Sequence, residues 1–245
     1  NELVLAVNEQ SVFGLALSWT NAFHPTAKYV RHYGAVPELL DQLLEKVTPQ
    51  NKVQYSCFED ETERILLFEQ KGFTLFRKTY MESLQIEALL VALTPVKLPE
   101  NFRSLHEILQ NHEQRESLFK LLKFNYEQTH LHNEVADYTW QEWEGHLLGD
   151  EPDLDLSYVV VEENEVKGYI MVHKSSEDHY EVGWVGLSEG GDLQGILKRQ
   201  LMAMQNLGAK TVEIEVDTTN NLAMQLFEFI DLEQIKSWNS YLLYK

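Results

Sequence analysis

The stretch "EVDTTNNLAMQLFEFIDL", residues 215–232, joins two strand-like segments through a helix-like one. The segment before the helix, "TVEIEV" (211–216), alternates apolar and polar residues, as a half-buried strand does. Polar residues 218–221 then precede apolar residues at helical spacing, which predicts a helix over 221–230. Because a strand follows the helix, the order strand, polar cap, helix, strand is the first indication of the fold.

The chain contains this pattern twice. Residues 3–14 ("LVLAVNEQSVFG") align without a gap with residues 157–168 ("SYVVVEENEVKG") at an offset of 154. Residues 65–80 align with residues 223–241 at an offset of about 159, and both segments read as a helix with Leu-Phe-Glu, a turn and a strand. Two matches in the same order predict an internal duplication.

Each copy can be divided into elements by its hydrophobic period and turn residues. In the second copy we predict a hairpin (158–161 and 168–173), a strand (180–187), a helix (193–206) and a strand (211–216), preceded by helices at 113–128 and 140–148. The first copy has a hairpin (2–7 and 11–19), strands at 27–33, 52–58 and 73–83, and helices at 37–47 and 60–71. It lacks the opening strand and helices. A connector at 93–102, with two prolines, separates an incomplete module (1–92) from a complete one (103–245).

Composition limits the class of protein. The formal net charge of −19 repels nucleic acids and anionic membranes, and it favours a cationic partner or simply solubility. The apolar run 88–93 is too short to span a bilayer, and the first residues lack a signal-peptide pattern. Cys57 is the only cysteine, so we expect no internal disulfide, a packing role for the thiol and a cytoplasmic location. The oligomeric state is not predicted.

The helix after the 211–216 strand carries a recognisable motif. Asn220, Ala223, Leu226, Phe227 and Glu228 follow the spacing N-x-x-A-x-x-L-Y-E, with Asp-Leu where Gly-Phe is usual. In the first copy, Phe-Glu at 68–69 is followed by Gly-Phe at 72–73, but Glu and Arg replace the Asn and Ala of the motif. With the strand order, this resembles the GNAT (GCN5-related N-acetyltransferase) superfamily, in particular its tandem two-module members.

The resemblance implies an α/β fold of two GNAT-like modules. Each would have a mixed, mostly antiparallel twisted sheet, flanked by helices, with two central parallel strands that splay apart. Acyl-CoA would lie in the gap of the more complete C-terminal module, with its pyrophosphate on backbone N–H groups at a helix N-terminus. The cofactor contacts implied by the resemblance are Trp184, Val185, Gly186, Leu187, Gly190, Gly191, Leu193, Gln194, Gly195 and Asn220. Asn220 has an alternative role as a plain N-cap.

The sequence also departs from the family. The loop pattern Arg/Gln-x-x-Gly-x-Gly/Ala has Glu189, Asp192 and Gln194 at its three defined positions, and the first copy keeps only Gly34 in the equivalent loop. Phe227 and its counterpart Phe68 replace the tyrosine that often protonates the leaving thiolate, and water, Tyr180 or Tyr241 are the substitutes.

The acceptor site is predicted around the fourth strand of the second copy. Glu181 is the candidate base, because that strand flanks the acceptor in this fold; the alternative is a solvated strand face. Further candidates for the base are Glu215, Asp217, His173 and His179. Tyr138 and Trp140, with Trp143, are candidates for lining the acceptor pocket, or else they belong to the core. The His-x-His at 130–132 has no completing ligands, so no metal is expected.

Two functions remain open at this point. In the first, the protein is an acyl-CoA (acetyl-CoA) dependent N-acyltransferase acting on a small-molecule or peptide amine, cationic amines included, with the C-terminal module active. In the second, it is a non-catalytic GNAT-fold protein that binds a small molecule or a protein partner. The departures at 189, 192, 194 and 227 favour the second function, and the intact strand order and Asn220 favour the first.

Overall fold

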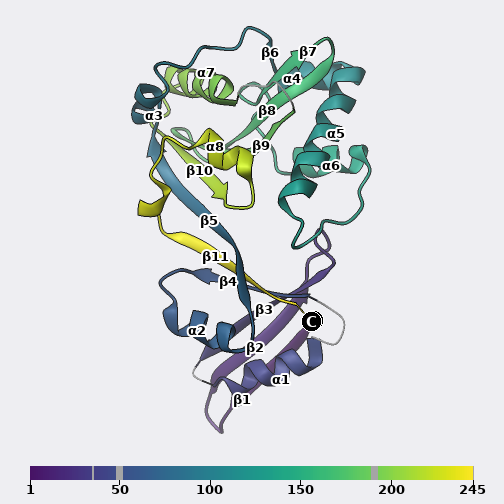
Figure 1. The fold of residues 1–245 in the computed structure, drawn as a ribbon, viewed down its shortest axis with the longest axis vertical. Helices are drawn as coiled ribbons and strands as arrows, with labels where there is room; N and C mark the ends of the chain where they lie inside the picture. Colours follow the sequence, from purple (N-terminus) through teal and green to yellow (C-terminus); the bar gives the residue numbers. More distant parts are fainter. Residues whose placement is uncertain (35, 48–51, 189–192, 245) are drawn as a thin grey trace. The chain divides into compact units, whose positions relative to one another are not determined.

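A computed structural model describes residues 1–34, 36–47, 52–188 and 193–244, and the chain forms two compact units (Figure 1). Unit 1 comprises Asn1–Thr79, His130–Asp137 and Lys236–Lys245. Unit 2 comprises Tyr80–Thr129 and Tyr138–Ile235. Each unit combines part of a mixed sheet with flanking helices, so the predicted α/β class with two modules is confirmed. Among the described residues, no helix is both long and apolar enough to cross a membrane.

The sheet of unit 1 is built mostly from the first copy. Its strand order is β1 (Glu2–Val7), β2 (Val12–Thr20), β3 (Ala27–Gly34), β4 (Lys52–Phe58), β11 (Ser237–Leu243) and the first part of β5 (Thr74–Gln85). The β3–β4 pair is parallel, whereas β1–β2, β2–β3 and β4–β11 are antiparallel. Helix α1 (Glu38–Val47) buries an apolar face in this unit's core, and α2 (Thr62–Gln70) contributes Phe68 to it.

The sheet of unit 2 continues from the second part of β5 in the order β10 (Thr211–Asp217), β9 (His179–Leu187), β8 (Glu165–Lys174), β7 (Tyr158–Glu162) and β6 (Phe102–Ser104). Helices α7 (Leu193–Asn206) and α8 (Asn221–Leu226), with α3 (Ile86–Ala92), join one apolar core with these strands. Helices α5 (His112–Thr129) and α6 (Trp140–Gly149) pack against each other, and α5 contacts β8 and β9 (Figure 1). The short α4 (Leu105–Gln110) follows β6 and begins with a capping box.

The helix predicted over 221–230 is shorter than expected. It ends at Leu226, with Phe227 as its C-cap, so the prediction was wrong for its last turn. Phe227 is 1% exposed and contacts Phe229, which shows that these aromatic residues enter the core as the helix stops. A 3-10 turn (Leu232–Gln234), capped by the Asp231 side chain, then leads to β11. Aromatic and β-branched residues are weaker helix formers than Leu or Met, and here packing decides the boundary.

The final strand, β11, belongs to the second copy in the sequence but to unit 1 in the structure. β11 follows the second-copy elements in the sequence, yet it pairs with β4 of the first copy, from Trp238 opposite Phe58 to Leu243 opposite Val53. Tyr241 and Leu242 are buried in unit 1. Conversely, residues 80–92 belong to unit 2. The compact units therefore exchange segments relative to the boundaries 1–92, 93–102 and 103–245, which remain a prediction about the repeat.

Corresponding residues of the two sheets differ in how far they are buried. Leu5 and Leu15 are cross-strand neighbours on β1 and β2, and the repeat aligns them with Val159 and Tyr169 of unit 2. Val159 and Tyr169 are 0% and 1% exposed on the sheet that α5 covers, whereas Leu5 is 45% exposed. The first copy thus has an apolar pair at this place in its sheet, of which Leu5 is far more exposed than its counterpart Val159.

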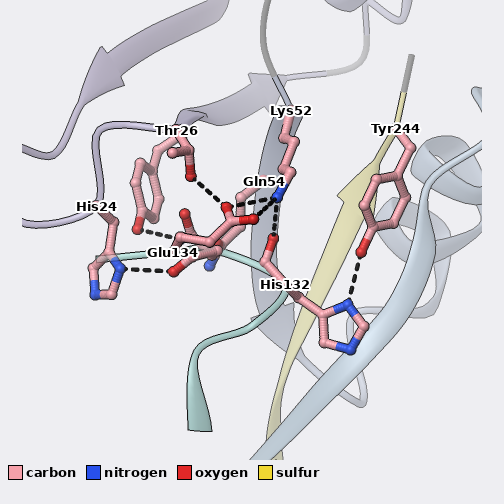
Figure 2. Close-up of polar contacts among 9 residues, drawn as sticks. His24, Thr26, Lys52, Gln54, His132, Glu134 and Tyr244 are labelled. Carbon is pink, nitrogen blue, oxygen red and sulfur yellow. Dashed lines mark hydrogen bonds and ion pairs between the residues drawn. The ribbon is translucent and has the colours of Figure 1, made fainter. Parts of the chain in front are cut away.

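The segment His130–Asp137 covers part of unit 1 (Figure 2). The Asn133 side-chain amide donates to the Tyr29 hydroxyl and to Gln54 Oε1, both at 2.8 Å. Glu134 accepts from Lys52 Nζ at 2.6 Å and from Thr26 Oγ1 at 2.9 Å. The loop between α5 and α6, although it comes from the second copy, is therefore fixed on the sheet of the first.

Candidate functional site

The parallel pair β9–β10 in unit 2 separates partway along its length. The paired residues run from His179–Thr211 to Val182–Ile214, but β9 continues to Leu187 and β10 to Asp217. Beyond Val182, β9 keeps its antiparallel ladder with β8. A strand edge whose neighbour diverges presents N–H and C=O groups that an extended amide-containing ligand can pair with. Residues 184–187, implied as cofactor contacts by the resemblance, lie on this edge.

A β-bulge in β9 lies where the strands separate. Val182 faces Val172 and Val185 faces Ile170, so Gly183 and Trp184 together oppose the single residue Met171. Val182 and Val185 consequently both pack into the core with α7, while Trp184 turns toward α5 and α6. The bulge thus re-aims one aromatic side chain at the start of the gap.

The Trp184 ring is held by three groups of unit 2. Its Nε1–H donates to Asp150 Oδ2 at 3.1 Å. Its centroid lies 5.1 Å from that of Tyr126 and 6.0 Å from that of Trp143, the latter at 87°. Trp143 is fully buried, whereas Tyr126 and Trp184 are partly exposed and Asp150 is exposed. We call Tyr126, Trp143, Asp150 and Trp184 the Trp184 corner.

Gly186 lies beneath another aromatic ring. A Cβ at this position would overlap the Tyr169 ring, which crosses the strand from β8 and is 1% exposed. Tyr169 forms a hydrogen bond with the Asn125 side chain of α5, and burial raises the pKa of its hydroxyl. Gly186 therefore allows β8, β9 and α5 to pack closely, in addition to any contact it makes with a ligand.

The loop expected to hold a pyrophosphate lies partly outside the described residues. Glu189, Gly190, Gly191 and Asp192 are not among them. Helix α7 begins directly afterwards, with Leu193 and Gly195 buried and Gln194 half-buried. The described first turn of α7 carries no acidic residue, and the helix dipole places partial positive charge at this end. Five residues of the sequence separate the end of β9 from the start of this helix.

Asn220 acts as the N-cap of α8. Its side-chain oxygen accepts from the backbone N–H of Ala223 at 3.1 Å, which is the local role that the sequence left open. Phe227, at the other end of the helix, is buried. Both substitutes for the missing acid are also buried: Tyr180 in the core of unit 2 and Tyr241 in that of unit 1.

Glu181 lies on β9 between two neighbouring strands. Its register partners are His173 on β8 and Glu213 on β10. Glu213 lies 3.5 Å from His179 Nε2, and His179 Nδ1 is 2.8 Å from Thr211 Oγ1. These side chains, at alternate positions of adjacent strands, share one face of the sheet, opposite the face that carries Tyr180 and Val182 into the core. Glu181, His173 and His179 are therefore grouped at the paired end of β9 and β10, whereas the candidates Glu215 and Asp217 lie on β10 beyond its last paired residue, Ile214.

His173 is confined on this face. A Cβ on Gly183 would lie 2.6 Å from His173 Cε1, so the imidazole lies directly against that glycine. Both ring nitrogens are buried, and neither has a hydrogen-bond partner among the described residues. Since buried polar groups normally have partners, this imidazole is a candidate for contact with a bound ligand or water.

Tyr138 and Trp140, the two aromatic candidates for the acceptor pocket, lie in different surroundings. The Tyr138 ring lies 4.6 Å from that of His146 and 6.3 Å from that of Trp143, next to the Trp184 corner. Trp140, by contrast, faces His112 at the start of α5, with a centroid distance of 6.3 Å. Sequence reasoning treated Trp184 only as a backbone contact and missed Tyr126 and Asp150. A tryptophan between Gly183 and Gly186 was the available signal, since glycine in a strand often marks a bulge.

In unit 1 the parallel strands β3 and β4 also diverge, but a side chain bridges the space between them. β3 and β4 pair from Ala27–Lys52 to Tyr29–Gln54 and then separate. The Arg31 guanidinium crosses this gap and donates to the Ser56 backbone oxygen at 2.7 Å. Helix α1, which would face a pyrophosphate, begins with Glu38 and Asp41 in its first turn. Both features disfavour an anionic, extended ligand in unit 1.

Metal ligands do not converge at either divergence in the part of the chain that the structure describes, because no group of three His, Cys, Asp or Glu side chains could hold an ion there. Of the His-x-His pair, His130 stacks on His24, and His132 Nδ1 lies 2.7 Å from the Tyr244 hydroxyl.

The sequence matches no family model and no curated protein, whereas the fold matches solved structures. A GCN5-related N-acetyltransferase from Sphaerobacter thermophilus aligns with 99% of this chain and 80% of its own, at 14% identity and a TM-score of 0.66. A tandem GNAT protein from the clavulanic acid biosynthesis pathway aligns with 98% of this chain and 81% of its own, at 9% identity and a TM-score of 0.57.

A third similar structure is a GCN5-related glucosamine N-acetyltransferase region in a fungal multi-domain β-N-acetylglucosaminidase. It covers 97% of this chain and 32% of its own, at 12% identity and a TM-score of 0.59. At these identities the likeness concerns the fold alone. The chain has the GNAT fold, as its motif and strand order predicted.

Proposed function

We propose that this chain, whose fold is that of the GCN5-related N-acetyltransferases, is an N-acyltransferase that takes an acyl group from acyl-CoA to an amine in unit 2. The observation that carries the proposal is the divergence of β9 and β10, with only five residues between the end of β9 and the start of α7. An open strand edge suits the amides of a pantetheine arm, and a helix N-terminus suits a pyrophosphate.

The reaction follows from the groups around the divergence. The amine nitrogen attacks the thioester carbonyl carbon, the carbon–sulfur bond breaks, and the amide forms. Glu181 takes the proton that the nitrogen loses. The thiolate leaves and takes a proton from water, because Phe227 has no proton to give and Tyr180 and Tyr241 are buried. A thiolate is a weak enough base to leave without a side-chain acid at neutral pH.

Unit 1 supports the fold rather than the chemistry in this proposal. Arg31 bridges its divergence, and two carboxylates stand in the first turn of α1. The alternative function, a GNAT-fold protein that binds without acyl transfer, is favoured by the buried Phe227 at the position of the usual acid.

Binding and chemistry can be tested separately. Calorimetric titration with acetyl-CoA, followed by hydrogen exchange, should show protection at residues 184–187 and at the start of α7, with residues 30–34 unchanged. Asp192→Gly should tighten binding, most at low salt, because the resemblance assigns Asp192 to the loop that would hold the phosphates and the change removes its negative charge. Protection confined to unit 1 would show that the site is placed wrongly.

The chemical step is tested by release of free CoA thiol with a panel of amines. Glu181→Gln should lower the rate by about 10²–10⁴-fold at unchanged acetyl-CoA affinity. Glu177→Gln, on the exposed β8–β9 turn, is the matched control and should behave as wild type. Acetyl-CoA binding without thiol release for any amine would favour the non-catalytic alternative.

A further inference from the structure

The negative charge of this protein is concentrated in one unit. Unit 2 contains 27 acidic and 10 basic residues, and unit 1 contains 12 acidic and 10 basic residues. Thus 17 of the 19 net negative charges belong to the unit with the open divergence. A field of this sign raises the local concentration of cations and slows the approach of anions. It does not itself define a site, which needs specific groups.

The Trp184 corner supplies such groups. The faces of aromatic rings are negative, and a cation held over Trp or Tyr is stabilised by that quadrupole. Asp150 adds a carboxylate that already accepts from Trp184 Nε1 and so is fixed beside the ring. Trp143 forms a fully buried floor, and Tyr126 stands beside Trp184 at an interplanar angle of 31°. The corner combines aromatic faces with a full negative charge at a partly exposed position.

Two basic residues of α5, the helix that carries Tyr126, are paired with other groups. Lys123 Nζ is held by the Tyr138 backbone oxygen at 2.6 Å and lies 3.5 Å from Glu127. Arg115 pairs with Glu144 at 2.6 Å. Within the described ranges, no Lys or Arg lies over the Trp184 ring, although six other aromatic rings carry such a cation. The corner therefore has the chemistry of a cation site without an internal cation on Trp184.

The distance from the corner to the candidate base restricts the ligand. Trp184 and Glu181 are three residues apart on one strand, which corresponds to about 10 Å of extended chain. The nitrogen that reacts at Glu181 must lose its proton, so the group at the corner is a different one. A molecule with two or more amines separated by several bonds can place one at each position.

We propose that the Trp184 corner binds the second cationic group of a di- or polycationic amine, and so selects such amines as acceptors. The role of the amine as an acceptor rests on the proposed function, whereas its binding at the corner does not. Asp150 neutralises the bound ammonium, and the Trp184 and Tyr126 rings contact it. The remaining amine then extends along β9 toward Glu181. Trp184 is in this proposal a specificity-determining residue.

The probe is spermidine, titrated by calorimetry into the full chain without acyl-CoA at 150 mM salt, with 1,8-octanediol as the neutral counterpart of similar length. Spermidine should bind and the diol should not. Trp184→Leu should weaken spermidine binding about five- to tenfold, and Trp184→Phe should restore most of it, because a second aromatic face is present again. Asp150→Asn should weaken it by a similar factor.

Controls separate this site from general attraction to an acidic surface. Trp19→Leu, a half-buried tryptophan of unit 1, should leave spermidine affinity unchanged. Circular dichroism and melting temperature establish that the Trp184 variants fold. Equal spermidine affinity in wild type and Trp184→Leu, or equal binding of the diol, would overturn the proposal, as would no spermidine binding to the wild type.

The two proposals fail independently. If acetyl-CoA neither binds nor turns over, the proposed function fails, while the spermidine titration still decides whether the cation site exists. If both hold, steady-state rates should show Trp184→Leu raising KM for spermidine with little change in kcat. The same variant should leave KM for a monoamine such as butylamine unchanged, since a monoamine has no second cation.

Discussion

Arg31 and Ser56 are joined by a hydrogen bond of 2.7 Å across the gap where β3 and β4 diverge in unit 1. The guanidinium also lies over the Trp238 ring, 5.0 Å from its centroid. A side chain of unit 1 thus bridges the divergence of its two parallel strands, and Arg31 thereby becomes part of the structure of this unit.

Arg31→Ala should lower the free energy of unfolding by about 1–3 kcal/mol, because the partly buried Ser56 carbonyl loses a charged donor. Acetyl-CoA affinity should not change, since the proposed site is in unit 2. Urea unfolding and calorimetry measure the two quantities. The exposed Arg103→Ala is the control, with an expected effect within about 0.5 kcal/mol. A new acetyl-CoA site in Arg31→Ala would show that unit 1 is competent once the bridge is removed.

Gly186→Ala should destabilise the protein by about 1–3 kcal/mol, because the added methyl group overlaps the Tyr169 ring in a packed core. Gly145→Ala on α6 has free space around the new methyl group and should be neutral or stabilising by about 0.5–1 kcal/mol. Thermal and urea unfolding compare the pair. Equal stability of the two variants would mean that Tyr169 can move aside, despite its bond to Asn125.

Removal of residues 236–245 should unfold unit 1. This deletion takes away β11, exposes the edges of β4 and β5, and uncovers the core that contains Tyr55, Tyr241 and Leu243. Hydrogen exchange should show rapid exchange across β4 while β8 and β9 remain protected. A chain that lacks only Lys245 serves as the control. Persistent protection of β4 in the truncated chain would contradict the proposed dependence of unit 1 on β11.

Stability should fall as the solution is acidified, partly because of His24. His24 is 6% exposed, Nδ1 donates to the Asn133 backbone oxygen at 2.8 Å, and its ring stacks on His130. Burial lowers the pKa of His24, and the nearby positive charge of Arg77 lowers it further, against the opposing effect of the backbone hydrogen bonds.

The direction of the pH effect follows from this lowered pKa. The unfolded chain takes up a proton at about pH 6.5, whereas the folded chain does so only at lower pH. The contribution of His24 is therefore fully present above about pH 6.5 and is lost as pH falls toward the folded pKa. His24→Gln should flatten the profile of unfolding free energy between pH 5 and 7, and the exposed His106→Gln should not. An unchanged slope in His24→Gln would contradict this assignment.

Much of the fold was predictable because the hydrophobic period of each segment and the repeated order of the segments indicate the same helices and strands. The first-copy strands and helices appear within a few residues of their predicted bounds, since each has a clear apolar period and polar turns at its ends. The last turn of α8 was not predictable, because Phe227 has the spacing of a helical residue but packs as a C-cap.

Contacts between segments that are far apart in the sequence could not be predicted, because the local sequence does not specify the partner. The sequence of β11 reads as a strand in either copy, and nothing in it specifies β4 as its partner. The same holds for the loop at Asn133, whose amide finds Tyr29 and Gln54 only in three dimensions. The Trp184 corner was missed for a related reason: the bulge that turns Trp184 toward Tyr126 and Asp150 is visible only when β8 and β9 are paired.

The placement of β11 has a consequence for biosynthesis. A ribosome makes β1 to β4 well before β11, the strand that closes their sheet, because β4 and β11 are far apart in the sequence. Until then the edge of β4 is open, with Tyr55 and Cys57 on a core that lacks Tyr241 and Leu243. The nascent chain must keep this early half from aggregating for as long as roughly 180 further residues take to translate, about 9–36 s at 5–20 residues per second. Protein quality control would therefore encounter the first half as an unfinished intermediate, and chaperones that bind exposed apolar strands are expected to bind it.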